Sequence, residues 1–254
     1  MEAWHLKGGM LLELMRYDEA IDCFDKALEL DPTYAELWND KGTAFKWFGR
    51  YHEALKCYDK ALELDPENVY AWSNKGLVLG DFGRYEDALE AYDKALKIDS
   101  KHVDTWYNKA VDLNKFGRPQ EALKAYDMAL KLNPEDGEIW YNKGVTYSKL
   151  GMNQEALKCY DKSLEIDPQK NAWNNRGNTL NRIGEHQKAL ESYEKALEID
   201  PWDVTPLNNK GDILEKLGKY DSALNAYDKA LKIDPKNSAV LFNKGHILGK
   251  LGKI

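Results

Sequence analysis

The sequence has little of what membrane, secreted and nucleic-acid-binding proteins need. Its apolar runs fall short of the roughly 18 residues of a membrane-spanning helix, and no signal-peptide pattern opens it. The three cysteines, Cys23, Cys57 and Cys159, include no CxxC pair, which argues against a disulfide scaffold and predicts a reduced, cytoplasmic chain. Lysine and arginine number 36 against 43 aspartates and glutamates, and this net charge of −7 argues against nucleic acid as a partner.

The sequence also lacks the motifs that carry common chemistry. It contains no GxSxG, HExxH, P-loop or dinucleotide-binding glycine pattern. The cysteines have no histidine or cysteine partner in register, and the five histidines are scattered. We therefore expect no catalytic residues, no metal site and no cofactor. A catalytic domain elsewhere in a longer parent protein stays open.

What the sequence does contain is a repeated segment. The first five of its repeating tryptophans stand 34 residues apart, the sixth follows after 33, and two leucines continue the series: Trp4, Trp38, Trp72, Trp106, Trp140, Trp173, Leu207 and Leu241. We number the positions of each repeat so that Trp4 is position 4. A fixed period of this length indicates a repeat architecture.

The other recurring positions predict two helices in each repeat. Small residues at positions 8, 20 and 27 and an aromatic residue at position 24 lie on two stripes at helical spacing. Glycine at position 15 suits a helix C-cap, and Asp-Pro at positions 31 and 32 ends the second helix. Pro119 and Pro206 then fall in the first turn of a helix, where proline is tolerated. A hairpin of this size must stack on its neighbours to bury its apolar face.

The pattern resembles the tetratricopeptide repeat over the whole chain, similar to prokaryotic members with an asparagine ladder. The resemblance implies an all-α fold, a right-handed superhelical α-solenoid of tandem helix-turn-helix repeats. We expect a single solenoid over residues 1–254, built of units 1–34, 35–68, 69–102, 103–136, 137–169, 170–203 and 204–237 and a half unit 238–254.

The outer stripe, which we define as positions 2, 5, 6, 9, 12 and 13 of the first helix, points away from the core. Position 6 lies about 200° around the helix from position 4. The resemblance implies that this stripe lines a concave groove that holds an extended peptide. Position 6 is asparagine in six consecutive repeats, and an amide can pair with both the N–H and the C=O of a peptide. The alternative is that these amides bond to the neighbouring helix.

Other positions of the outer stripe change along the chain. Tyrosines and valines occur in its middle, and lysines recur at position 13. The tyrosines are candidate anchors for a ligand, or else they pack between adjacent first helices. The candidate peptide-binding residues are Asn74, Asn108, Asn142, Asn175, Asn209, Asn243, Tyr107, Tyr141, Val111, Val145, Lys115 and Lys149.

Position 7 is basic in all eight repeats, and position 25 is acidic in all seven second helices. We expect a lysine–aspartate pair across each hairpin, such as Lys143 with Asp161. The alternative, a basic rail for phosphate, is the weaker interpretation.

Two functions follow from these patterns. The first is a protein-binding module that holds an extended protein or peptide ligand in its concave groove. The second is a structural scaffold that acts by head-to-tail self-association, or as the recruiting arm of a larger protein. It is suggested by the atypical first repeat, with Leu6, Leu12 and Met15, and by the half unit at the other end. Neither function involves a membrane or nucleic acid.

Overall fold

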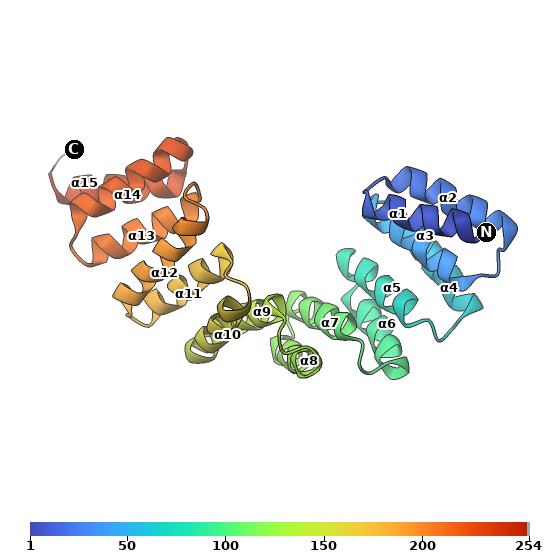
Figure 1. Cartoon of the computed structure of the whole chain (residues 1–254). Coiled ribbons are helices and arrows are strands. Elements are labelled where there is room, and N and C mark those ends of the chain that lie inside the picture. Colours follow the sequence, from blue (N-terminus) through green and yellow to red (C-terminus); the bar gives the residue numbers. More distant parts are fainter. Residues whose placement is uncertain (253–254) are drawn as a thin grey trace. The chain divides into compact units, whose positions relative to one another are not determined.

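The computed structural model describes residues 1–252, and within them every regular element is a helix (Figure 1). The packing divides the chain into two compact units, Met1–Asn133 and Pro134–Ile254. None of the helices described is long and apolar enough to cross a membrane. Lys253 and Ile254, the last residues of the expected half unit, lie outside the described residues. That the repeats form one continuous solenoid stays a prediction.

The first unit contains four helix pairs. Its helices are α1 (Glu2–Glu13), α2 (Tyr17–Leu30), α3 (Ala35–Trp47), α4 (Tyr51–Leu64), α5 (Val69–Asp81), α6 (Tyr85–Ile98), α7 (Val103–Lys115) and α8 (Pro119–Leu132). The second unit contains three pairs and a further helix. Its helices are α9 (Gly137–Lys149), α10 (Asn153–Ile166), α11 (Lys170–Arg182), α12 (His186–Ile199), α13 (Val204–Lys216), α14 (Tyr220–Ile233) and α15 (Ser238–Lys250).

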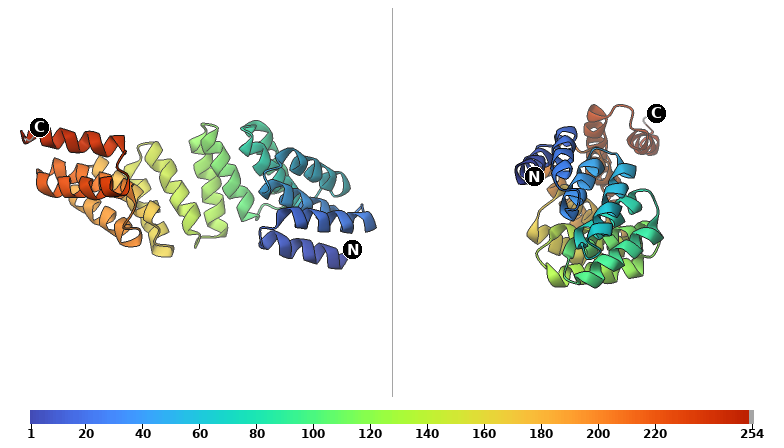
Figure 2. Two further views of the ribbon diagram at one scale, coloured as in Figure 1. Left: turned by 90° about the horizontal axis from the view of Figure 1, so that it is seen from above. Right: turned by 90° about the vertical axis from the view of Figure 1, so that its right-hand side faces the viewer.

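Within each unit the helices pack in sequence order, as the left view of Figure 2 also shows. The two helices of a repeat contact each other, and the second helix contacts the first helix of the next repeat, as α2 does with α3. The first helices of consecutive repeats also contact each other, as α1 does with α3 and α11 with α13. Their outer stripes are therefore brought side by side.

Each helix pair closes on an aromatic ring, as the recurring positions predict. The position-24 side chains are fully buried, and the ring of Tyr58 lies against Gly42 of the partner helix. A Cβ atom built on Gly42 would stand 2.6 Å from Tyr58 Cε1. The prediction that small residues at position 8 permit a close helix approach is confirmed.

Position 15 ends the first helix in the left-handed backbone region. Its glycines have positive φ values, such as +81° at Gly49, which confirms the predicted C-cap. In the first repeat Met15 takes this conformation with φ 58°, the only non-glycine residue with positive φ among those described. A side chain in this region costs about 1–2 kcal/mol.

The position-4 tryptophans join consecutive repeats rather than filling the centre of a hairpin. They are half-buried, and the indole N–H donates to the backbone carbonyl at position 32 of the preceding repeat. Trp38 bonds in this way to Pro32, Trp72 to Pro66 and Trp140 to Pro134, each at 2.9 Å.

The predicted lysine–aspartate pairs form between repeats, not within a hairpin. Asp161 pairs with Arg176 of the next repeat at 2.7 Å, so its assignment to Lys143 was wrong. Lys75 pairs likewise with Asp59 of the preceding repeat, at 2.6 Å. The reason is the stacking order, which places each second helix against the following first helix. The ammonium of Lys75 also lies over Trp72, 5.4 Å from the ring centroid.

The three cysteines are buried and form no disulfide. Burial raises the pKa of the Cys57 thiol to about 11, which keeps it in the unreactive protonated form.

Replacing Met15 by glycine should stabilise the first repeat. The change removes the left-handed penalty, while the 74% exposed side chain contributes little packing. After the entropy that glycine loses on folding, a net gain of about 0.5–1 kcal/mol is expected. Hydrogen exchange of α1 amides would measure it. Met10→Gly is the matched control, because Met10 lies inside α1 with a 65% exposed side chain and glycine in a helix interior should destabilise. Faster exchange of α1 in Met15→Gly would contradict the prediction.

Candidate peptide-binding surface

The structure places all twelve candidate residues on first helices, and none of them is buried. The asparagines, tyrosines and valines are half-buried, and Lys115 and Lys149 are exposed. Tyr107, Asn108, Val111 and Lys115 share the outer stripe of α7 in the first unit. Tyr141, Asn142, Val145 and Lys149 occupy the same positions of α9 in the second unit.

Most position-6 amides bond to position 5 of the preceding repeat. Asn74 Nδ2 donates to Asn39 Oδ1 at 3.1 Å, on neighbouring helices α5 and α3. In the second unit, Asn209 donates to Asn174 and Asn243 to Asn208, each at 3.1 Å. For Asn74, Asn209 and Asn243, the alternative is therefore confirmed: their amides bond to the neighbouring helix.

These bonds use only part of each amide. An asparagine side chain has two N–H donors and a carbonyl oxygen with two lone pairs. Asn74 commits one donor to Asn39, and Asn209 commits both, to Asn174 and to Asn178 Oδ1 at 3.0 Å. The inter-repeat bond therefore fixes the amide plane while the carbonyl oxygen keeps its capacity to accept from a ligand.

Asn108 is the exception. Its expected partner position holds Ser73, whose hydroxyl already accepts from Thr105 Oγ1 at 2.9 Å. Within the part of the chain that the structure describes, the half-buried Asn108 side chain forms no hydrogen bond. A complete amide is thus available on α7, beside Tyr107 and Val111.

The remaining two asparagines have partners other than a side-chain amide. Asn142 bonds to a backbone carbonyl, and Asn175 bonds to the tyrosine at position 5 of the preceding repeat. Asn142 Nδ2 donates to the Glu138 carbonyl of its own helix at 3.1 Å. Asn175 Nδ2 donates to Tyr141 Oη at 3.0 Å, and burial raises the pKa of that tyrosine. The structure therefore brings Asn175 and Tyr141 together.

The two candidate tyrosines also pack on the aromatic core. The Tyr107 ring lies 6.3 Å from Tyr126, and the Tyr141 ring lies 6.2 Å from Tyr160, between ring centroids. Both remain half-exposed on the outer stripe. Packing against a buried ring restrains each tyrosine, which is what a ligand anchor requires.

Beside Lys115 lies a buried carboxylate that the sequence analysis did not single out. Asp112 is 1% exposed and accepts from Tyr92 Oη at 2.9 Å and from Lys115 Nζ at 3.2 Å. It fits because residue 80 is glycine: a Cβ atom there would stand 1.9 Å from Asp112 Oδ2. Burial raises the pKa of Asp112.

An acidic pocket of about 680 Å³ opens where α3 and α5 begin. Its wall includes four carboxylates, Glu36, Asp40, Asp65 and Glu67, and no lysine or arginine. Burial raises the pKa of Asp40. None of the four is among the candidates predicted from the sequence, although the charges of Glu36 and Asp40 were visible at positions 2 and 6 of the outer stripe.

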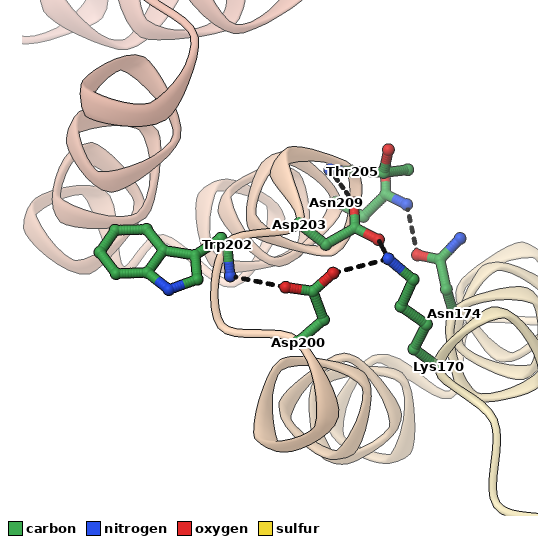
Figure 3. A network of polar contacts seen from close by, with 7 residues as sticks. All are labelled: Lys170, Asn174, Asp200, Trp202, Asp203, Thr205 and Asn209. Atoms are coloured by element: carbon green, nitrogen blue, oxygen red, sulfur yellow. Dashed lines mark hydrogen bonds and ion pairs between the residues drawn. The ribbon is translucent and has the colours of Figure 1, made fainter.

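A second polar network surrounds the turn after α12 (Figure 3). Lys170 Nζ bonds to Asp200 Oδ2 at 2.6 Å and to Asp203 Oδ2 at 3.1 Å. The same turn carries Trp202, whose backbone N–H donates to Asp200 while its side chain is 74% exposed. The network was not predicted from the sequence because Lys170 and the two aspartates lie at opposite ends of one repeat, with Lys170 and Asp200 30 residues apart.

Comparison with known families supports the repeat assignment. Tetratricopeptide repeat models match residues 2–34, 39–103, 103–136, 137–170, 169–236 and 226–254. No curated protein matches the sequence.

Similar solved structures include three repeat proteins. The likeness to pilF of Pseudomonas aeruginosa has a TM-score of 0.71 at 20% identity, over 85% of this chain and 97% of that one. With the APC/C hetero-tetramer Cut9-Hcn1 the TM-score is 0.70 at 16% identity, over 98% of this chain and 49% of that one. The chain thus spans about half of that relative. These likenesses show an all-α helical-repeat solenoid.

A third structure is that of YrrB, described as a TPR protein with an unusual peptide-binding site. Its TM-score is 0.52 at 25% identity, over 87% of this chain and 97% of that one.

Replacing Asp112 by asparagine should change how stability depends on pH. Because burial raises the folded-state pKa above its ordinary 3.8, the carboxyl group favours folding at low pH and loses that contribution as pH rises. Asparagine cannot ionise but can still accept from Tyr92. The stability of Asp112→Asn relative to the unchanged protein should therefore increase from about pH 4 to pH 7. Urea unfolding at both pH values measures this, with exposed Asp104→Asn as control. A pH-independent difference would contradict the account.

Proposed function

The chain belongs to the tetratricopeptide repeat family, and from that premise we propose that it binds an extended protein segment along the outer stripes of its first helices. Family membership supports a protein–protein interaction module. The likeness to YrrB, itself described as having a peptide-binding site, supports a peptide as ligand. The observation that carries the proposal is the amide of Asn108, which lies half-buried on the outer stripe and forms no hydrogen bond with any residue that the structure describes.

The stripe of α7 offers three kinds of contact to a peptide. Asn108 can donate to a peptide carbonyl and accept from a peptide N–H. Tyr107 and Val111, four residues apart on one face of the helix, provide half-buried apolar surface beside it. Lys115 lies farther along the helix, where its pair with Asp112 leaves the ammonium exposed. Such contacts grip a backbone and select an apolar side chain beside it.

The acidic pocket at α3 and α5 adds a preference for charge. A pocket lined by four carboxylates and flanked by Tyr34 and Tyr70 favours a lysine or arginine side chain over an acidic one. The ligand we propose is therefore an extended segment with a basic part at α3 and α5 and an apolar part at α7.

Asn108→Ala should weaken the binding of such a segment without loss of stability. Each hydrogen bond lost costs about 0.5–1.5 kcal/mol, which is roughly a two- to tenfold increase in Kd. A peptide array screened with the full chain identifies the probe, and fluorescence anisotropy measures its affinity. The triple variant Asn108→Ala, Asn142→Ala, Asn175→Ala should bind more weakly still.

The control for this experiment is Asn225→Ala. Asn225 is an exposed asparagine on α14, a second helix, and its loss should leave affinity unchanged. Equal affinity of Asn108→Ala and the unchanged protein for the selected peptide would contradict the role of Asn108.

A second candidate function is self-association, favoured by the surface of α1. Leu6, Met10 and Leu14 are each 65% exposed and recur every four residues, so they form an apolar stripe. A stripe of this kind suits a contact with another copy of the chain, as a scaffold requires.

Leu6→Lys combined with Met10→Lys should abolish self-association. Sedimentation equilibrium of the unchanged protein is expected to show a mass that rises with concentration, whereas the variant stays monomeric. Tyr70→Lys, at an exposed aromatic of α5, is the control and should associate normally. A strictly monomeric unchanged protein at high concentration removes this second candidate.

A further inference from the structure

Three metal-ligating side chains converge on the first two repeats. His5 lies on α1, and Glu36 and Asp40 lie one turn apart on α3. Their ligating atoms all lie within 4.8 Å of one another. His5 Nε2 and Asp40 Oδ2 are 2.7 Å apart, with the two side chains 21% and 30% exposed. His5 and Asp40 are thus half-buried while Glu36 is exposed, so the cluster is accessible to an ion from solvent.

This cluster departs from the pattern of the neighbouring repeats. The same two positions, 5 and 6, hold the neutral amide pairs Asn39–Asn74, Asn174–Asn209 and Asn208–Asn243. An amide pair satisfies itself and needs no ion. Between the first two repeats, the corresponding pair is the imidazole of His5 and the carboxylate of Asp40, and Glu36 at position 2 adds a second carboxylate. The stacking geometry that aligns the amides thus aligns three ligands.

Second-sphere contacts orient both carboxylates. Tyr34 Oη donates to Glu36 Oε2 at 2.6 Å, and Asn39 Nδ2 donates to Asp40 Oδ1 at 3.3 Å. Each carboxylate thus has one oxygen held by the protein, and the other oxygen of Asp40 faces His5. The His5 ring is fixed edge-on between Tyr34 and Phe24, with centroids 5.9 and 6.1 Å away. Hydrogen-bonded ligands of this kind are typical of metal sites.

The ligand set selects a class of ion. One neutral imidazole and two carboxylates carry a charge of −2, which a divalent cation balances. Nitrogen disfavours Mg²⁺ and Ca²⁺, which take oxygen ligands, and suits Zn²⁺, which combines histidine with carboxylates. With bonds of about 2.0–2.2 Å, the ligand atoms of a tetrahedral site stand roughly 3.3–3.6 Å apart. Small rotations of the three side chains would reach that separation.

From this geometry we propose that His5, Glu36 and Asp40 bind Zn²⁺, with water completing its coordination. The ion links α1 to α3 and so stabilises the contact between the first two repeats. Zn²⁺ binding does not require a peptide, but Glu36 and Asp40 also line the acidic pocket, so the ion and a basic peptide side chain would compete for these two carboxylates.

The test titrates Zn²⁺ into the full chain after treatment with a chelator, using isothermal titration calorimetry. One ion per chain is expected at this site. The decisive variant combines His5→Asn with Asp40→Asn, because it recreates the amide pair of the other repeats while removing two ligands. Its affinity should fall by more than the roughly 10–100-fold that loss of a second-sphere partner costs. Circular dichroism without metal checks that the variant is folded.

Further variants separate this site from nonspecific binding. Glu36→Gln removes an exposed ligand and should also weaken binding. Asp104→Asn, exposed on α7, and His246→Asn, beside Glu215 on α13, should leave binding unchanged. Co²⁺ bound to the unchanged protein should give a visible spectrum of a low-symmetry site that the double variant lacks. Absence of Zn²⁺ binding, or equal binding by the unchanged protein and the double variant, overturns the proposal.

Discussion

All other contacts in the structure build on one repeated contact, in which a buried tyrosine ring packs against a glycine of the partner helix. A Cβ atom on Gly76 would stand 2.6 Å from the ring of Tyr92, so the two helices of that repeat approach more closely than most residues allow. The ring is fully buried, but its hydroxyl reaches the first helix of the following repeat, where it donates to Asp112. Close packing inside a repeat thereby sets the position of polar groups beside the outer stripe.

Contacts between repeats fix how each repeat is aligned with the one before it. An indole N–H, a lysine ammonium and an asparagine amide each reach from a first helix to the preceding repeat, as Trp72, Lys75 and Asn74 do in the third repeat. The ion pairs are partly exposed and contribute about 0–1 kcal/mol each. Their main effect is on orientation, because they fix how each first helix is rotated about its own axis relative to the preceding repeat. A row of side chains is then presented in a fixed orientation, which lowers the entropic cost of binding an extended ligand.

The sequence predicted the period, the paired helices, the glycine caps and the buried aromatic positions, because each depends on residues close together within one repeat. It failed for Asp161, whose partner Arg176 belongs to the next repeat. The free amide of Asn108 also could not be predicted, since it depends on a hydrogen bond between Ser73 and Thr105 across a helix interface. His5, Glu36 and Asp40 looked scattered in the sequence because only stacking brings position 5 of one repeat against positions 2 and 6 of the next.

The central claim is that most position-6 amides hold repeats together while Asn108 remains available to a ligand. Hydrogen exchange of side-chain amide protons, measured by nuclear magnetic resonance on the full chain, tests this directly. Asn209, which donates twice, should exchange slowest, Asn74 and Asn243 at intermediate rates, and Asn108 fastest. Protection of the Asn108 amide equal to that of Asn209 would contradict the account.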